Sequence, residues 1–299
     1  MTTLALATRA VPSVSAPVTE ILLENLPLSH RPTLFDCSAE RPTTLELTPT
    51  AFRVPGIARD IEVKIASDLD ELEEAFQLVA ANYRARGYEV ASTKPLRFTP
   101  YHALPDTRTL VAKHDGHIVA TFSIVLDNTL LGLPMESIYG EEITALRNKG
   151  HRLLETTSLA DTGLSVREFM QVFVALIRLG MQYHTAHGGD AYVITVNPRH
   201  KSFYSKVLGF VPLGPCRAYA CVQDAPAEAF WVSNDLLKER APRMHTEIFG
   251  EPLPRSALVA PSLPRDLARY FDRQSSLSDG KTVEAVLDYQ EHYGNARRW

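Results

Sequence analysis

A short run of polar and aromatic residues follows a predicted buried strand late in the chain. The run reads TVNPRHKSFYSKVLGF over residues 195–210 and includes Asn197, Arg199, His200 and Tyr204. Ligands of α/β proteins commonly bind where strands end at one edge of a sheet. Arg199 and His200 are therefore candidates to contact a substrate carboxylate or a donor phosphate. The alternative for His200 is an ordinary position at the start of a helix.

Composition limits the classes of function that this segment can serve. The 299 residues are 45% hydrophobic and 22% charged, which is typical of a soluble protein with a sizeable core. The formal net charge of −4 argues against a general nucleic-acid binder. No apolar run approaches the roughly 18–20 residues of a membrane span, and the N-terminal stretch lacks the basic start of a secretory signal. We therefore expect a cytoplasmic protein.

The cysteines indicate neither disulfides nor a metal site. The chain has three of them, Cys37, Cys216 and Cys221. They are too few and too scattered for a disulfide framework, as expected in a reducing compartment. Cys216 and Cys221 have no second pair to complete a zinc site, so we expect no bound metal.

Sequence patterns divide the chain into three parts. Residues 1–60 hold seven of the twenty prolines and predict an irregular N-terminal arm. Residues 61–232 alternate between strand and helix patterns. Residues 233–299 read as a helical C-terminal extension.

The middle part predicts an α/β or α+β sheet covered by helices. Residues 61–67 alternate as a strand, and an amphipathic helix follows, capped by Ser67 and ended by Gly87. Asp115-Gly116 joins two β-rich runs as a hairpin. The later pattern is helix (135–150), strand (151–161), long buried helix (165–188), strand (190–197), short helix, and closing strands at 210–214 and 217–224. Ser165 and Glu168 have capping-box spacing at the start of the long helix.

This order of elements carries a resemblance to a known superfamily. Asn197 lies seven residues before Tyr204, and Gly209-Phe210 follows, which resembles the late motif of GNAT acyltransferases. Three separated stretches, TPYHALPDTRTLVAK, GLPMESIYGEEITALRNKGHRLLETTSLA and VNPRHKSFYSKVLGFVPLG, together resemble the FeeM-type N-acyl amino acid synthases. That family is related to the acyl-homoserine lactone autoinducer synthases. The resemblance covers roughly residues 61–222 and implies a GNAT-like mixed twisted sheet with helices on both faces.

The resemblance also implies roles for particular residues. It makes Glu155 the general base or the anchor of an ammonium group, whereas the alternative is a glutamate on the solvent face of a strand. Backbone N–H groups around Thr157, Ser158 and Leu159 become candidates for the oxyanion contact. Tyr204 falls where many GNAT enzymes keep a tyrosine that protonates the leaving thiolate. Its alternative is a packed aromatic residue with a hydrogen-bonded hydroxyl.

The donor is suggested by a departure from the superfamily pattern. A CoA-dependent GNAT enzyme has a glycine-rich loop before its long helix, where backbone N–H groups hold pyrophosphate. Here the equivalent stretch SLADTGLSVREFM has only Gly163. The absence of the glycine-rich loop fits a donor presented on acyl carrier protein as a phosphopantetheine thioester, with no bound cofactor. It fits a decayed enzyme equally well. In the first case Asn197, Arg199 and His200 would border the donor's arm.

Two further sets of residues are weaker candidates. Apolar residues alternate with small ones at Leu130, Leu131, Leu133 and Met135. They could line a tunnel for the acyl chain, although such residues more often belong to the core. A basic patch that binds an acidic carrier protein could be formed by Arg147, Lys149, Arg152 and Arg167. Such a cluster of charges is more often simply a solvated face.

The leading hypothesis is an N-acyltransferase that moves a fatty acyl group from acyl carrier protein to the α-amino group of an amino acid. The alternatives are a CoA-dependent GNAT N-acetyltransferase and a non-catalytic acyl-binding or regulatory module on the same fold. An autoinducer synthase that uses S-adenosylmethionine is a fourth reading, but the N-terminal Trp and Arg/Phe-rich pattern of that family is absent from the sequence.

Overall fold

One eight-stranded mixed sheet organises the chain. The computed structural model describes residues 49–57, 59–278 and 280–294, so Cys37 and most of the expected N-terminal arm lie outside the described residues. The strand order is β1-β2-β3-β4-β5-β6-β8-β7. The strands are β1 (Phe52–Arg53), β2 (Ile61–Ile65), β3 (Arg108–His114), β4 (His117–Leu126), β5 (Leu153–Asp161), β6 (Ala191–Val196), β7 (Val211–Tyr219) and β8 (Ala225–Ser233).

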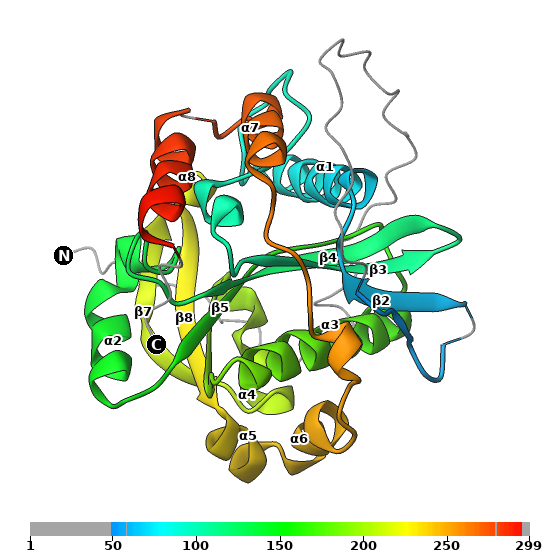
Figure 1. Ribbon diagram of the computed structural model, residues 1–299. Coiled ribbons are helices and arrows are strands. Elements are labelled where there is room, and N and C mark those ends of the chain that lie inside the picture. The colour runs from blue at the N-terminus through cyan, green and yellow to red at the C-terminus, as the bar shows by residue number, and fades with distance from the viewer. Residues whose placement is uncertain (1–48, 58, 279, 295–299) are drawn as a thin grey trace, which may run out of the picture.

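Helices cover both faces of the sheet, as the sequence predicts (Figure 1). On one face lie α1 (Leu69–Ala85), α2 (Glu136–Asn148), α7 (Arg265–Gln274), α8 (Lys281–Tyr293) and the short 3₁₀ helix η2 (Pro100–Ala103). On the other lie α3 (Val166–Ala186), α4 (Lys201–Val207), α5 (Asn234–Arg240) and α6 (Pro242–Phe249). Further 3₁₀ turns are η3 (Pro198–His200), η4 (Ala220–Val222) and η5 (Arg255–Ala257). Each face therefore has its own hydrophobic core.

The hairpin between β3 and β4 forms where the sequence predicts it. Asp115 and Gly116 have φ angles of 49° and 82°, the left-handed conformation that a two-residue hairpin turn requires. Because the turn sets the register, the apolar residues of both strands reach the two cores in a fixed alternation.

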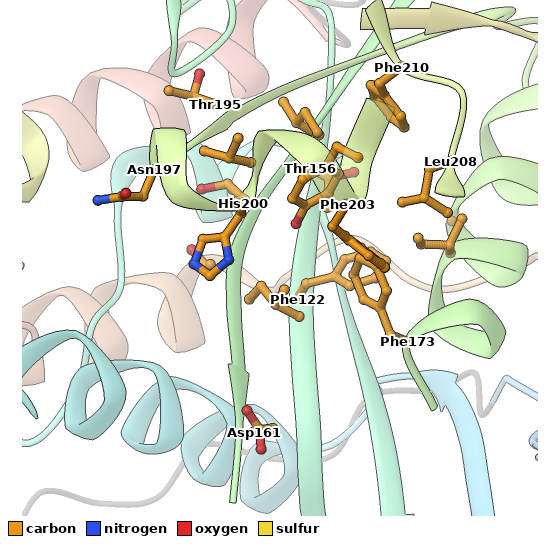
Figure 2. A pocket seen from close by; sticks show the side chains of 18 of the residues that line it. Phe122, Thr156, Asp161, Phe173, Thr195, Asn197, His200, Phe203, Leu208 and Phe210 are labelled. Atoms are coloured by element: carbon orange, nitrogen blue, oxygen red, sulfur yellow. The ribbon is translucent and has the colours of Figure 1, made fainter. Parts of the chain in front are cut away.

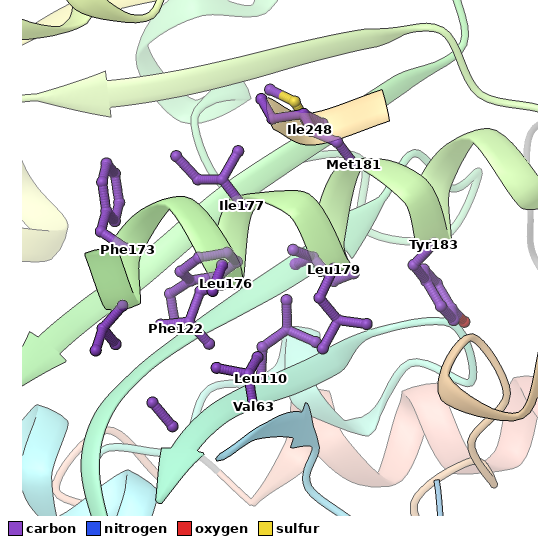
Figure 3. Packing of buried hydrophobic residues seen from close by; sticks show 14 of the residues in the cluster. Val63, Leu110, Phe122, Phe173, Leu176, Ile177, Leu179, Met181, Tyr183 and Ile248 are labelled. Carbon is purple, nitrogen blue, oxygen red and sulfur yellow. The ribbon is translucent and has the colours of Figure 1, made fainter. Parts of the chain in front are cut away.

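Helix α3 is the main support of the sheet on its face. Its predicted capping box is present, since the Ser165 hydroxyl accepts from the Glu168 N–H and the Glu168 carboxylate accepts from the Ser165 N–H. Figure 3 shows Leu176 and Leu179 directed at Leu110 and Phe122 of the sheet. The helix is thereby held along nearly its whole length against β2, β3 and β4.

Three local predictions need correction. The two closing strands expected at 210–214 and 217–224 are one edge strand, β7, with irregular pairing around Gly214. The sequence reading missed β8, which pairs with both β6 and β7. Pro212 and Pro215 make β7 hard to recognise from the sequence, and an edge strand tolerates residues without an N–H donor. Pro226 does the same for β8 and lies beyond the pairing with β6, which ends at Glu228. The cap of α1 is Asp68, which accepts from the Glu71 N–H, and not Ser67.

Helices α5 to α8 occupy the stretch expected to be a helical extension. They pack on both faces of the sheet, with α6 beside α3, α5 against α6 and β8, and α7 and α8 beside η2 (Figure 1). The division of the chain into an arm, a central domain and an extension stays a prediction.

Candidate active site

The site begins where two neighbouring strands part. Strands β5 and β6 are parallel and pair only from Leu153 with Ala191 to Thr156 with Ile194. Beyond these pairs, β5 continues beside β4 alone and β6 continues beside β8 alone. The separated strands leave an opening through the sheet at residues 156–158 and 195–197.

A larger cavity of about 470 Å³ lies on the α3 face of this opening. Its inner wall is apolar and aromatic, and Figure 2 shows Phe122, Phe173 and Phe203 gathered on one side of it. The lining residues of α3 run from Val166 to Met181, or about 22 Å of helix. An elongated apolar cavity of this kind suits a hydrocarbon chain.

A smaller cavity of about 240 Å³ lies on the opposite face. Polar and aromatic residues line it, among them Arg97, Thr99, Tyr101, Ser137, Glu155, Tyr219 and Cys221. The two cavities meet at the opening, because the same residues line both: Tyr83, Tyr88, Thr156, Thr157, Ser158, Thr195, Val196 and Asn197. A molecule in one cavity can therefore reach a molecule in the other.

Glu155 is a buried carboxyl group in the smaller cavity. It is only 2% exposed, and its Oε2 accepts a hydrogen bond of 2.9 Å from the Met135 N–H. Burial raises its pKa from the ordinary 4.5 to about 8; the Met135 N–H opposes the shift, and the Glu136 charge adds to it. The alternative of a glutamate on a solvent-exposed strand face is therefore wrong.

The backbone of β5 is irregular beside Glu155. Ser158 has a φ angle of 60°, and the pairing of β5 with β4 shifts register between Thr121 and Ser123. Such bulges turn backbone groups out of the sheet ladder. Burial raises the pKa of the nearby Tyr83 hydroxyl, and the charge of Arg97 and the Ser158 N–H both oppose this shift. Thr157 and Leu159 line the larger cavity on either side of this bulge.

Tyr204 stands on α4 at the wall of the larger cavity. Its ring packs edge-on against Phe173, Phe203 and Phe210. Burial raises the pKa of its hydroxyl well above the usual range, with a smaller contribution from Tyr83. The hydroxyl thus stays protonated at neutral pH, which suits a packed aromatic residue and a proton donor equally.

Positive charge gathers at the mouth of the larger cavity. Arg86, Arg199 and His200 all line it, and Figure 2 shows His200 beside Asn197. The Arg199 Nε lies 3.0 Å from the His200 Nε2. Burial, with the charges of Arg199 and Arg86, lowers the pKa of His200 to about 4, so the cationic groups here are the two guanidiniums. Asn197 caps η3 by accepting from the Arg199 N–H at 3.2 Å.

The start of α3, which borders the same cavity, already holds carboxylates of its own. The Asp161 Oδ2 accepts from the N–H groups of Gly163 at 2.8 Å and Leu164 at 3.0 Å. The Glu168 carboxylate accepts from the Ser165 N–H and from its hydroxyl. These donors belong to the loop and cap that lead into α3, where backbone N–H groups could otherwise hold an anion, and Glu168 is also paired with Arg59 at 3.0 Å.

All eight residues predicted from the sequence line one or both cavities. The sequence reading missed Tyr83, Arg97, Tyr101 and Tyr219. Tyr83 looked like a core residue of α1, and the other three come from loops and an edge strand that only the fold brings to Glu155. Tyr101 and Tyr219 lie near Glu155, whose charge adds to the effect of burial in raising their pKa values.

The two weaker expectations fail. Leu130, Leu131, Leu133 and Met135 pack in the core on the α1 face and do not line the larger cavity. The expected basic patch does not form, because the Arg147 guanidinium is bound to Asp127 at 2.7 Å and to Glu136 at 2.8 Å. Arg152 and Arg167 lie beyond opposite ends of β5, which is about 26 Å long.

Two classes of feature are absent from the part of the chain that the structure describes. No three His, Cys, Asp or Glu side chains come together there as a metal site would require. None of its helices is both long and apolar enough to cross a membrane.

Comparison with known proteins points to one family. The model of the N-acyl amino acid synthase FeeM matches residues 74–233, just over half of the chain. The solved structure of FeeM, an N-acyl amino acid synthase from uncultured soil microbes, has 26% sequence identity and a TM-score of 0.54, covering 62% of this chain and 96% of that one. The acyl-homoserine lactone synthase LasI has 17% identity and a TM-score of 0.49, covering 66% of this chain and 98% of its own. No curated protein matches the sequence.

The raised pKa of Glu155 predicts how stability depends on pH. Between about pH 4.5 and 8 the unfolded chain releases this proton while the folded chain keeps it. The free energy of unfolding therefore falls as pH rises, by up to about 1.4 kcal/mol per pH unit from this group, and the loss is complete above pH 8. Urea denaturation should show Glu155→Gln becoming more stable than the wild type by a margin that grows from pH 5 to pH 8.

Glu142→Gln is the matched control for this measurement. Arg217 lowers the pKa of Glu142, so that carboxyl group is ionised in both states above pH 5 and its variant should show no such growth. A Glu155→Gln margin that is constant with pH would show that Glu155 ionises normally in the folded protein.

Proposed function

Because the chain belongs to the family of the N-acyl amino acid synthase FeeM, we propose that it transfers a fatty acyl group from acyl carrier protein to the α-amino group of an amino acid. Membership makes the chain an acyltransferase and confirms the family predicted from its motifs. The observation that carries the finer proposal is the pair of cavities that meet at the opening between β5 and β6, one apolar and one holding a buried carboxyl group. In this proposal the acyl chain occupies the larger cavity and the amino acid occupies the smaller.

Glu155 acts on the incoming amine. An α-amino group must lose a proton before its nitrogen can attack a thioester carbonyl, and a general base works best when its pKa lies near the working pH. A carboxyl group with a pKa of about 8 meets this condition. Glu155 takes one proton from the ammonium group, the neutral amine then attacks the carbonyl carbon, and the second N–H proton leaves to solvent as the amide forms.

The remaining steps take place at the opening in the sheet. The Ser158 N–H and the Tyr83 hydroxyl, which lie together there, are placed to stabilise negative charge on the carbonyl oxygen. As the carbon–sulfur bond breaks, the Tyr204 hydroxyl donates its proton to the thiolate and then recovers one from solvent. The high pKa of Tyr204 supports this role, because the hydroxyl is protonated when the step begins.

The start of α3 supports a carrier-bound donor over CoA. The N–H groups of Gly163, Leu164 and Ser165, which lead into α3, are already bonded to Asp161 and Glu168, and the Asp161 carboxylate would repel a diphosphate. A phosphopantetheine arm carries one phosphate, and the guanidiniums of Arg86 and Arg199 lie at the mouth of the acyl cavity to meet it.

Removing the base tests the proposal directly. Glu155→Gln keeps an oxygen for the Met135 N–H and cannot take the amine proton, so acyl transfer should fall by about 100-fold or more. Mass spectrometry of lipid extracts from cells expressing the wild type should show a new N-acyl amino acid that is absent with the variant. Glu142→Gln, outside both cavities, should leave the product unchanged.

Two results would contradict this assignment. Full activity of Glu155→Gln would remove Glu155 as the base. The absence of any N-acyl product from wild-type cells would favour the non-catalytic acyl-binding module.

Donor choice can be tested with one acyl chain on two carriers. Initial rates with palmitoyl acyl carrier protein should give a kcat/KM at least about tenfold above that with palmitoyl-CoA, because the diphosphate site is filled by the protein's own carboxylates. Equal values, or a preference for CoA, would support the CoA-dependent alternative.

The length of the acyl chain should respond to a change at the deep end of the larger cavity. Met181 lines it there, one helical turn beyond Ile177. Met181→Trp should shift the products toward shorter chains, since each methylene that no longer fits costs about 0.8 kcal/mol of burial. Product profiling by mass spectrometry checks this, with Met170→Trp as the control, because Met170 also lies on α3 but lines neither cavity. The same product lengths in both variants would mean that the acyl chain lies elsewhere.

A further inference from the structure

A second buried charge lies in the wall of the smaller cavity. Arg97 lines this cavity together with Glu155, and its side chain is only 6% exposed. Its Nη1 donates to the Glu89 Oε2 at 2.8 Å, its Nη2 donates to the Cys221 carbonyl at 3.1 Å, and its guanidinium lies 4.3 Å from the centre of the Tyr83 ring. A guanidinium has five N–H donors, so these bonds leave some for a ligand.

The charge around Arg97 is positive on balance. Glu89 forms ion pairs with both Arg97 and Arg84, since the Arg84 Nη2 also donates to its Oε1 at 2.7 Å. One carboxylate against two guanidiniums leaves one positive charge in a largely buried cluster. Such a surplus is costly unless an anion comes to meet it. The cavity thus presents a carboxyl group that can receive an amine and a guanidinium that can receive a carboxylate.

The C-terminal part of the chain holds this cluster in place. The Ser276 hydroxyl donates to the Glu89 Oε1 at 2.6 Å. Ser275 is fully buried, and its Oγ accepts from the Phe98 N–H at 3.1 Å and donates to the Phe98 carbonyl at 2.7 Å. Leu96 and Ser275 form a parallel β-bridge. Both serines follow α7, which lies beside α1 and η2 in Figure 1 and outside the stretch that matches the family model.

We propose that Arg97 binds the carboxylate of the acceptor and that Ser276 positions it there through Glu89. The proposal rests on the proposed function, in which the acceptor is an amino acid. Arg97 is then a specificity-determining residue, because it separates an α-amino acid from a plain amine with the same side chain. Ser276 is a positioning residue that acts from the C-terminal part of the chain.

The test compares acceptors that differ only in the carboxylate. Four pairs serve as probes: phenylalanine and phenethylamine, tyrosine and tyramine, leucine and isoamylamine, and tryptophan and tryptamine. With a fixed acyl donor, the wild type should prefer the amino acid of its best pair by about 100-fold or more in kcat/KM, as expected when a buried charge is left unpaired. Arg97→Gln should lose most of this preference, because it should slow the amino acid reaction far more than the amine reaction.

More conservative variants keep the test valid if Arg97→Gln fails to fold. Arg97→Lys keeps the charge beside Glu89 without the fork of N–H donors and should give an intermediate preference. Ser276→Ala should raise KM for the amino acid several-fold with the donor KM and the amine reaction unchanged, and Ser276→Thr should restore the wild-type value. Ser278→Ala is the matched control, since the Ser278 hydroxyl bonds to Asp272 and not to Glu89.

Different results overturn different claims. Arg97→Gln and Arg97→Lys with an undiminished preference for amino acids would overturn the role of Arg97. Equal KM values for Ser276→Ala, Ser278→Ala and the wild type would overturn the role of Ser276. A wild type that acylates the amines as well as the amino acids, or none of the eight probes, would overturn the proposed amino acid acceptor as well.

Discussion

Strands β5 and β6 share only four residue pairs before they diverge, and the arrangement of the site depends on this short pairing. Each strand keeps a partner on its other side, so the ladder is lost only along the opening. Backbone groups freed in this way must find other partners or a ligand. The N–H of Ser158 lies near enough to the hydroxyl of Tyr83, on α1, to lower the pKa that burial raises. Because side chains alternate across a strand, Glu155 and Thr156 face opposite sides of the sheet at the same place. One opening thereby brings a polar cavity and an apolar cavity together.

Burial of Glu155 lowers stability at neutral pH and gives the carboxyl group the proton affinity that the proposed chemistry requires. Desolvation destabilises its charged form and moves its pKa into the range where it exchanges a proton with an amine. The Met135 N–H limits the shift, and this donor precedes the first residue of α2, where backbone N–H groups have no partner within the helix. The position of α2 on the sheet therefore limits how far burial raises the proton affinity of the carboxyl group. Tyr101 and Tyr219, from two other segments, close the same cavity.

Local signals in the sequence predicted the parts of the site that depend on local structure. Asp115-Gly116 marks the hairpin and Ser165 with Glu168 marks the start of α3, because turns and caps need particular residues at fixed spacing. The position of Arg147 illustrates what such signals miss. It looked like a surface cation, and only the fold brings Asp127 and Glu136 to it. Arg97 is the opposite case, since its neighbours Glu89, Cys221 and Ser276 come from segments up to 187 residues apart.

Carboxylates of the protein itself occupy hydrogen-bond donors at two places in the site, before α3 and beside the smaller cavity. Their effect on the binding of an anion differs between the two places. At the start of α3, Asp161 and Glu168 each bond to backbone or hydroxyl donors, and Glu168 also pairs with Arg59 at 3.0 Å. At the smaller cavity, Glu89 is shared by two guanidiniums and so satisfies them only in part. The balance of charge therefore disfavours anion binding at the start of α3 and favours it at Arg97 in the smaller cavity. If the proposed roles hold, this difference favours a donor without a diphosphate and an acceptor with a carboxylate, although both positions contain the same kinds of residue.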